Sequence, residues 1–161
     1  MTTELTLLAF AVMLGVLHIV LASHAASWQR GYRWAASARD VEVPPLTGLA
    51  GRLDRSLHNF TETFPLFAAA VLAAHIAGKT GTLTLWGAGL YLGARLAYLP
   101  ISAAGIFLIR SLVWNVATFG IGLILFALLV KNSPLPAGKA CTWPARWLRP
   151  ERRWSPSLCM S

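Results

Sequence analysis

Charged residues are scarce in this sequence: Asp, Glu, Lys and Arg together account for 12% of its 161 residues. An ordinary soluble domain carries about 25%. Hydrophobic residues make up 56% of the chain. This balance argues against a water-soluble domain and indicates that most of the chain lies in lipid.

Cysteine is also nearly absent, because the chain contains only Cys141 and Cys159, both close to its end. No Cys or His group has the spacing of a metal site, so the sequence predicts no metal centre. The two cysteines could form a disulfide or remain free thiols.

Acidic residues number only six against 14 basic ones, which gives a formal net charge of +8. The basic residues lie in loops and in the C-terminal segment, whereas the apolar runs are almost free of them. No nucleic-acid motif occurs, and this distribution suits lipid headgroups better than nucleic acid.

What the sequence does contain is four apolar runs, each long enough to cross a membrane as a helix. We expect these spans at residues 5–27, 56–77, 82–101 and 110–130. The first run has no basic leader and is longer than the apolar core of a signal peptide, so we interpret it as a retained helix. The sequence therefore predicts an all-α integral membrane protein with a four-transmembrane-helix bundle over residues 1–130.

The connections between the runs differ in length. Residues 28–55 are expected to form a polar loop, interrupted by Pro44 and Pro45. Residues 78–81 form a tight turn, which makes the flanking helices antiparallel neighbours. A short apolar link is expected at residues 102–109. Three glycines, which would allow close helix approach, occur in the third run: Gly87, Gly89 and Gly93.

The segment 131–161 is rich in Pro, Arg and Trp, a mixture typical of a membrane interface or of a surface that binds a partner. Basic residues occur at both ends of the predicted bundle in similar numbers once the distal tail is discounted. The positive-inside rule therefore leaves the membrane orientation open.

A polar cluster is predicted at one end of the bundle. Arg55, Asn59 and Glu62 are spaced i, i+4 and i+7, which places them on one helix face. Antiparallel neighbours bring further polar residues to the same end: Arg52, Arg95, Tyr98, Arg110 and Ser111. Such a cluster suits a small anionic ligand that carries an amino group, because guanidinium groups bind carboxylates and Glu62 could accept from an ammonium.

A structural interpretation of the same residues also exists. Glu62 could be neutralised by Arg95 or Arg110 within the bundle, because an unpaired buried charge is costly. Arg110 could extend toward the headgroups from a span end. We expect Arg52 to face headgroups, and three histidines to be interhelical hydrogen-bonding residues: His18, His24 and His75.

These motifs carry a resemblance to a known family. Arg55-x-x-x-Asn59-x-x-Glu62, then Ala94-Arg95-x-x-Tyr98, then Arg110-Ser111 resembles the superfamily of membrane-associated proteins in eicosanoid and glutathione metabolism (MAPEG). The pattern is most similar to its bacterial members and to its microsomal prostaglandin E synthase and glutathione transferase branches. The resemblance covers roughly residues 5–130 and implies a homotrimer in a bacterial inner membrane, with glutathione bound between neighbouring subunits.

By position, the resemblance gives each motif residue a role. Arg55, Asn59 and Glu62 would hold the polar ends of glutathione, and Arg95 and Tyr98 would line its site. Arg110 and Ser111 would face the thiol and stabilise its thiolate, which is the nucleophile. The implied activity is glutathione-dependent transfer to a lipophilic electrophile, or reduction of a lipophilic hydroperoxide.

The chain departs from the synthase pattern at two positions, where Ser102 and Trp114 stand in place of residues with aromatic hydroxyls. This loss favours an alternative function. The chain could be a non-catalytic membrane subunit of the same fold, which docks on a larger membrane complex through its Trp- and Arg-rich tail.

Overall fold

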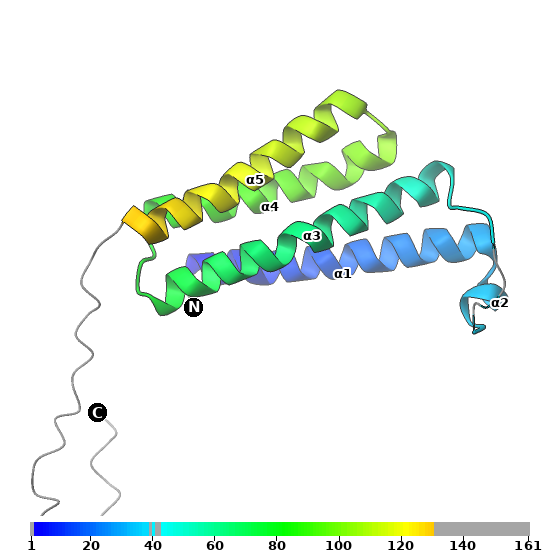
Figure 1. The fold of residues 1–161 in the computed structure, drawn as a ribbon, viewed down its shortest axis with the longest axis horizontal. Helices are drawn as coiled ribbons and strands as arrows, with labels where there is room; N and C mark the ends of the chain where they lie inside the picture. The colour runs from blue at the N-terminus through cyan, green and yellow to red at the C-terminus, as the bar shows by residue number, and fades with distance from the viewer. Residues whose placement is uncertain (1, 39, 41–42, 131–161) are drawn as a thin grey trace, which may run out of the picture.

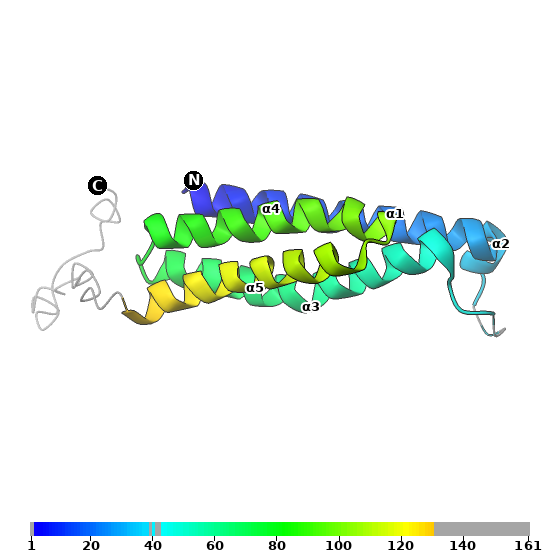
Figure 2. The ribbon, with the colours of Figure 1, turned by 90° about the horizontal axis from the view of Figure 1, so that it is seen from above.

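The computed structural model describes residues 2–38, 40 and 43–130, and its regular structure over these residues is entirely helical. Four long helices and one short one follow each other along the chain: α1 (Thr3–Arg30), α2 (Tyr32–Ala35), α3 (Gly48–Ile76), α4 (Thr82–Ala104) and α5 (Phe107–Val130). The long helices lie side by side along one common direction (Figures 1 and 2). The prediction of an all-α chain is thus confirmed, whereas the predicted tail at 131–161 lies outside the described residues.

The helices extend further than the apolar runs. The expected loop 28–55 is wrong at both ends, because α1 continues to Arg30 and α3 begins at Gly48. The charged residues at the start of α3 suggested a loop, but they alternate with Ala50 and Leu53, which are buried. This part of α3 is therefore an amphipathic helix with one face in the bundle. The link expected at 102–109 is reduced to residues 105 and 106.

Helix α4 packs most extensively against α5, and the two approach closely at a pair of glycines. A Cβ atom on Gly87 would lie 2.6 Å from the carbonyl oxygen of Gly120, and one on Gly120 would lie 2.7 Å from that of Gly87. A Cβ atom on Gly89 or Gly93 would instead point into open space, with no atom outside its own helix turn within 4 Å. The expected close approach is therefore confirmed at Gly87 but not at Gly89 or Gly93.

All four long helices contribute to the apolar core, and Ala11 and Leu14 are the residues from α1. Phe67 of α3 stacks on Tyr91 of α4 with ring centroids 3.9 Å apart, and Ile124 of α5 is fully buried. The tight turn between α3 and α4 makes them antiparallel neighbours, as the sequence predicted (Figure 1).

One end of the bundle is fixed by two long-range polar contacts. Glu4, at the start of α1, is buried and lies 3.1 Å from the hydroxyl of Thr84, in the first turn of α4. A carboxylate near two helix N-termini is favoured by their dipoles. Lys79, in the turn between α3 and α4, donates to the carbonyl of Leu128 at 2.6 Å. This contact satisfies a carbonyl in the last turn of α5.

Two of these helices are long and apolar enough to cross a membrane: α1 and residues Leu108–Val130 of α5. The outer face of α1 exposes many large apolar side chains, among them Phe10, Met13, Val16 and Ile19. Helices α3 and α4 are of similar length but carry charged residues within them, such as Arg55 and Glu62 on α3 and Arg95 on α4.

Candidate functional site: a basic pocket between α3, α4 and α5

A pocket opens between the starts of α3 and α5 and the later part of α4. It has a volume of about 320 Å³ and is lined by six described residues: Arg55, Asn59, Tyr98, Arg110, Ser111 and Trp114. We call it the main pocket. Pockets for small molecules typically occupy about 300–1,000 Å³, so the main pocket is large enough for a small ligand.

Helical spacing explains how the side chains converge. Arg55 and Asn59 are four residues apart on α3, and Arg110 and Trp114 are four residues apart on α5. Each pair therefore lies on one face of its helix. Tyr98, on α4, is buried and places a phenol in the wall between them.

The charge of the main pocket is positive. Two guanidinium groups, those of Arg55 and Arg110, line it, and none of its described lining residues is acidic. Neither side chain forms an ion pair with a described residue. The one contact of this kind among the described residues joins Glu62 to His58, and it is an ion pair only when the imidazole is protonated. The arrangement suits an anionic ligand, because guanidinium groups bind carboxylates through paired hydrogen bonds.

Arg95 lies behind the main pocket and not in its lining. Its side chain is 1% exposed, it donates to Asn59 Oδ1 at 2.8 Å, and it also donates to the hydroxyl of Thr63. No carboxylate pairs with it among the described residues. The buried cation therefore depends on neutral acceptors, and it holds the Asn59 amide in the pocket wall.

Two aromatic rings complete the surroundings of Arg95. Its guanidinium carbon lies 5.5 Å from the ring centroids of both Tyr91 and Tyr98. Each such cation–π contact stabilises a cation by about 0.5–2 kcal/mol, with the larger values where water is excluded. The hydroxyl of Tyr91 in turn lies 3.4 Å from that of Thr63. Arg95 is thus a positioning residue that ties α3 to α4 beneath the main pocket.

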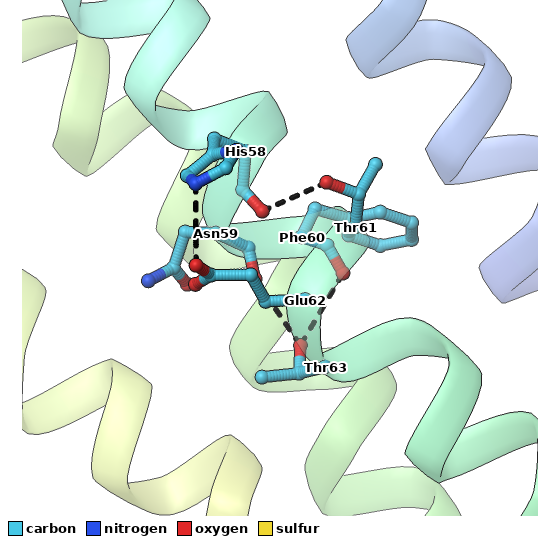
Figure 3. Close-up of polar contacts among 6 residues, drawn as sticks. All are labelled: His58, Asn59, Phe60, Thr61, Glu62 and Thr63. Atoms are coloured by element: carbon cyan, nitrogen blue, oxygen red, sulfur yellow. Dashed lines mark hydrogen bonds and ion pairs between the residues drawn. The ribbon is translucent and has the colours of Figure 1, made fainter.

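Glu62 lies away from this cluster. Its carboxylate is exposed and lies 3.2 Å from Nε2 of His58, one turn earlier on α3 (Figure 3). The structural interpretation in which Arg95 or Arg110 neutralises Glu62 is therefore wrong. The Thr63 hydroxyl, also drawn in Figure 3, lies within hydrogen-bonding distance of the backbone carbonyls of Asn59 and Phe60.

Arg52 also lies outside the main pocket. Its Nη1 donates to the carbonyl of Ala103 at 3.0 Å, which fixes the start of α3 against the end of α4. The predicted polar cluster is thus brought together only in part. Five of its residues line the main pocket, Arg95 supports the wall from behind, and Arg52 and Glu62 lie apart from it.

Two residues at the site were not predicted from the sequence: Trp114 lines the main pocket, and Thr63 accepts from Arg95. Trp114 is four residues after Arg110, and Thr63 is four residues after Asn59, so helical spacing from the motif residues could have found both. The prediction of interhelical hydrogen bonds from three histidines is wrong. His18 is buried and stacks on Phe60 of α3 at 4.9 Å, but its hydrogen bond goes to the carbonyl of Leu14 within α1. His24 and His75 are exposed.

Within the described residues, no group of three or more His, Cys, Asp or Glu side chains could hold a metal ion. Comparisons with known proteins gave one positive result. The family model described as "MAPEG family" matches residues 7–130. No curated protein and no solved structure matches the chain.

Proposed function

The chain belongs to the MAPEG family, and from that premise we propose that it is a glutathione-dependent membrane transferase or peroxidase. Its substrate would be a lipophilic electrophile or hydroperoxide. The observation that carries this proposal is the main pocket, where Arg55, Arg110 and Ser111 surround a volume of about 320 Å³ without an acidic side chain among the described lining residues.

In this proposal the four long helices are four membrane spans of an inner-membrane protein in a bacterium, and three copies form a trimer. Helices α3 and α4, with 29 and 23 residues, would be roughly 35–43 Å long at ~1.5 Å per residue and can cross a ~30 Å hydrocarbon core. The exposed apolar side chains of α1 then face lipid or a neighbouring subunit. Glu62, exposed on α3, is available to a ligand held between two subunits.

Glutathione fits the chemistry of the main pocket, because it carries two carboxylates, an ammonium and a thiol. Arg55 binds a carboxylate, and the Asn59 amide, held by Arg95, hydrogen-bonds the peptide backbone of the ligand. Tyr98 adds a phenolic hydroxyl, and Trp114 supplies an apolar wall. Because positions 102 and 114 are Ser and Trp, Tyr98 is the one residue with a phenol among the described lining residues.

Arg110 and Ser111 act on the sulfur. A guanidinium and a hydroxyl beside the thiol stabilise its thiolate form, which at neutral pH is otherwise only a few per cent of a free thiol. The thiolate then attacks an electrophilic carbon, a sulfur–carbon bond forms, and the leaving group departs with its electron pair. With a hydroperoxide, the sulfur takes the terminal oxygen, an alcohol leaves, and a second glutathione forms the disulfide and water.

The test separates binding from thiol ionisation. Glutathione is titrated calorimetrically into the detergent-purified protein, and its thiolate is followed by ultraviolet absorbance as the pH is raised. Arg55→Gln should weaken binding about tenfold or more, the effect of losing one charge-assisted hydrogen bond of ~1.5–3 kcal/mol. Arg110→Gln should shift thiolate formation to higher pH, since it removes the cation beside the sulfur.

Two controls make the result specific. Arg33→Gln removes one positive charge from the exposed helix α2 and should change neither measurement. S-methylglutathione has no ionisable thiol, so its affinity should be insensitive to Arg110→Gln. If the wild-type protein binds no glutathione, the catalytic proposal fails. The alternative of a non-catalytic subunit that docks through the tail, which lies outside the described residues, then takes its place.

A further inference from the structure

A second, smaller pocket lies beside the main pocket, at the turn between α4 and α5. Its volume is about 120 Å³, and its described lining residues are Arg52, Arg55, Ser102, Gly105, Ile106 and Arg110. We call it the arginine pocket. It lies at the end of the bundle where α4 turns into α5 beside the early turns of α3 (Figure 1). Its volume is well below the ~300 Å³ of a typical small-molecule pocket, so it suits one polyatomic group.

Three guanidinium groups face this small volume, and none of its described lining residues is acidic. Arg52 donates from Nη1 to the Ala103 carbonyl, and its other N–H groups can donate to a ligand. Arg55 and Arg110 have no ion-pair partner among the described residues. Three like charges so close together repel each other, and an anion bound between them would replace repulsion with charge-assisted hydrogen bonds.

The backbone holds Arg52 in this position. Gly105 follows α4 in the left-handed conformation, with φ 83°, and its N–H donates to the carbonyls of Ile101 and Ser102. A Cβ atom on Gly105 would lie 2.9 Å from Cζ of Arg52. The guanidinium thus packs directly on the turn, and the pocket is built from the fold and not only from extended surface side chains.

The surroundings favour a lipid over a soluble anion. Large apolar side chains next to the arginine pocket are exposed: Ile106 in the link before α5, and Leu108, Ile109 and Leu112 on the first turns of α5. A phosphate in the pocket would leave acyl chains free to lie along this apolar surface. The three guanidinium groups of the pocket also favour an anionic headgroup, because anionic lipids collect near basic regions of a membrane protein.

We propose that the arginine pocket binds a phosphate group, held by Arg52, Arg55 and Arg110, and that this group belongs to an anionic membrane lipid. The arginine pocket shares Arg55 and Arg110 with the main pocket. Each guanidinium has five N–H groups, enough to bind a phosphate in the arginine pocket as well as a group of glutathione in the main pocket. Lipid binding in the arginine pocket extends what the protein recognises from a ligand in the main pocket to a component of the membrane itself.

Lipid binding to the full-length protein is measured by native mass spectrometry, with titrations of phosphatidic acid and, separately, phosphatidylcholine. The wild-type protein should retain phosphatidic acid in preference to phosphatidylcholine. Arg52→Gln should weaken phosphatidic acid binding about tenfold, a loss of ~1.4 kcal/mol, because it removes one charge-assisted guanidinium–phosphate contact. Arg33→Gln removes the same charge outside the pocket and should leave the affinity within about twofold, since an exposed charge contributes little.

Arg52→Lys guards against a folding artefact, because it keeps the charge and the alkyl stem but loses the planar fork. It should elute as the wild type in gel filtration and bind phosphatidic acid with intermediate affinity. Equal wild-type affinities for the two lipids would overturn the proposal, and so would equal losses in Arg52→Gln and Arg33→Gln. If inorganic phosphate alone shows the dependence on Arg52, the phosphate comes from solution and the lipid assignment is wrong.

Discussion

The guanidinium of Arg95 donates to Oδ1 of Asn59 at 2.8 Å, and this bond joins a cation in the interior of the bundle to an amide in the wall of the main pocket. Since no described carboxylate pairs with Arg95, the amide is one of its few acceptors. The stability of the bundle and the shape of the candidate site therefore depend on the same contact.

The first prediction concerns this contact. Asn59→Asp gives Arg95 a carboxylate partner and should raise the unfolding temperature in detergent. It also places a negative charge in the main pocket, so it should weaken glutathione binding. Asn59→Leu removes the acceptor and should lower the free energy of unfolding by about 1.5–3 kcal/mol, the contribution of a hydrogen bond to a charged group.

Thr61→Val is the matched control for these two variants. The Thr61 hydroxyl is exposed and bonds only the carbonyl of His58 in its own helix turn. Thr61→Val should therefore change the stability of the protein and its glutathione affinity little. A fall in stability for Asn59→Asp equal to that for Asn59→Leu would contradict a role for Asn59 as the acceptor of Arg95.

A second prediction concerns Glu62. Glu62→Gln breaks an exposed i, i+4 pair with His58 and should destabilise the protein by only about 0.3–0.5 kcal/mol. If Glu62 contacts glutathione between subunits, the same change should weaken glutathione binding about tenfold, as expected for a lost charge-assisted bond.

His58→Gln separates these effects, because it breaks the pair and keeps the carboxylate. Its glutathione affinity should remain close to that of the wild type in a calorimetric titration. Equal affinities for both variants and the wild type would show that Glu62 plays no part in binding.

The third prediction concerns the turn at Gly105. Gly105→Ala should destabilise the protein by about 1–2 kcal/mol or more, because the left-handed conformation is unfavourable with a Cβ and Arg52 would have to move. Gly89→Ala, in the interior of α4 with open space around it, should instead stabilise by about 0.5–1 kcal/mol. Thermal unfolding in detergent distinguishes the two. A common sign for both changes would contradict the conformation assigned to the turn.

A fourth prediction concerns the contact between α4 and α5. Gly120→Ala places a methyl group 2.7 Å from the Gly87 carbonyl and should cost about 1–3 kcal/mol, typical of overpacking. Gly122→Ala on the same helix faces open space and serves as the control. Unfolding of both variants should be compared in the same detergent. Equal stability of the two would mean that the helices do not approach closely at Gly87 and Gly120.

The sequence alone supported the all-helical class, the family and the tight turn between α3 and α4, because apolar runs and i, i+4 spacing are local properties of the chain. Its helix boundaries were less accurate at the start of α3. The charges of Arg52 and Arg55 made this segment look like a polar loop, whereas Ala50 and Leu53 are buried by contacts with other helices.

In the candidate site, too, some features followed from the sequence and others only from the tertiary structure. Spacing within one helix placed Arg55 beside Asn59 and Arg110 beside Ser111, and both pairs line the main pocket. Only the packing of α3 against α4 decided that Arg95 is buried behind Asn59. Glu62 shares a helix face with Arg55, and only the folded structure shows that its side chain contacts His58 and does not line the main pocket. Sequence spacing fixes which residues share a helix face, but the direction of that face depends on side-chain packing between helices distant in sequence.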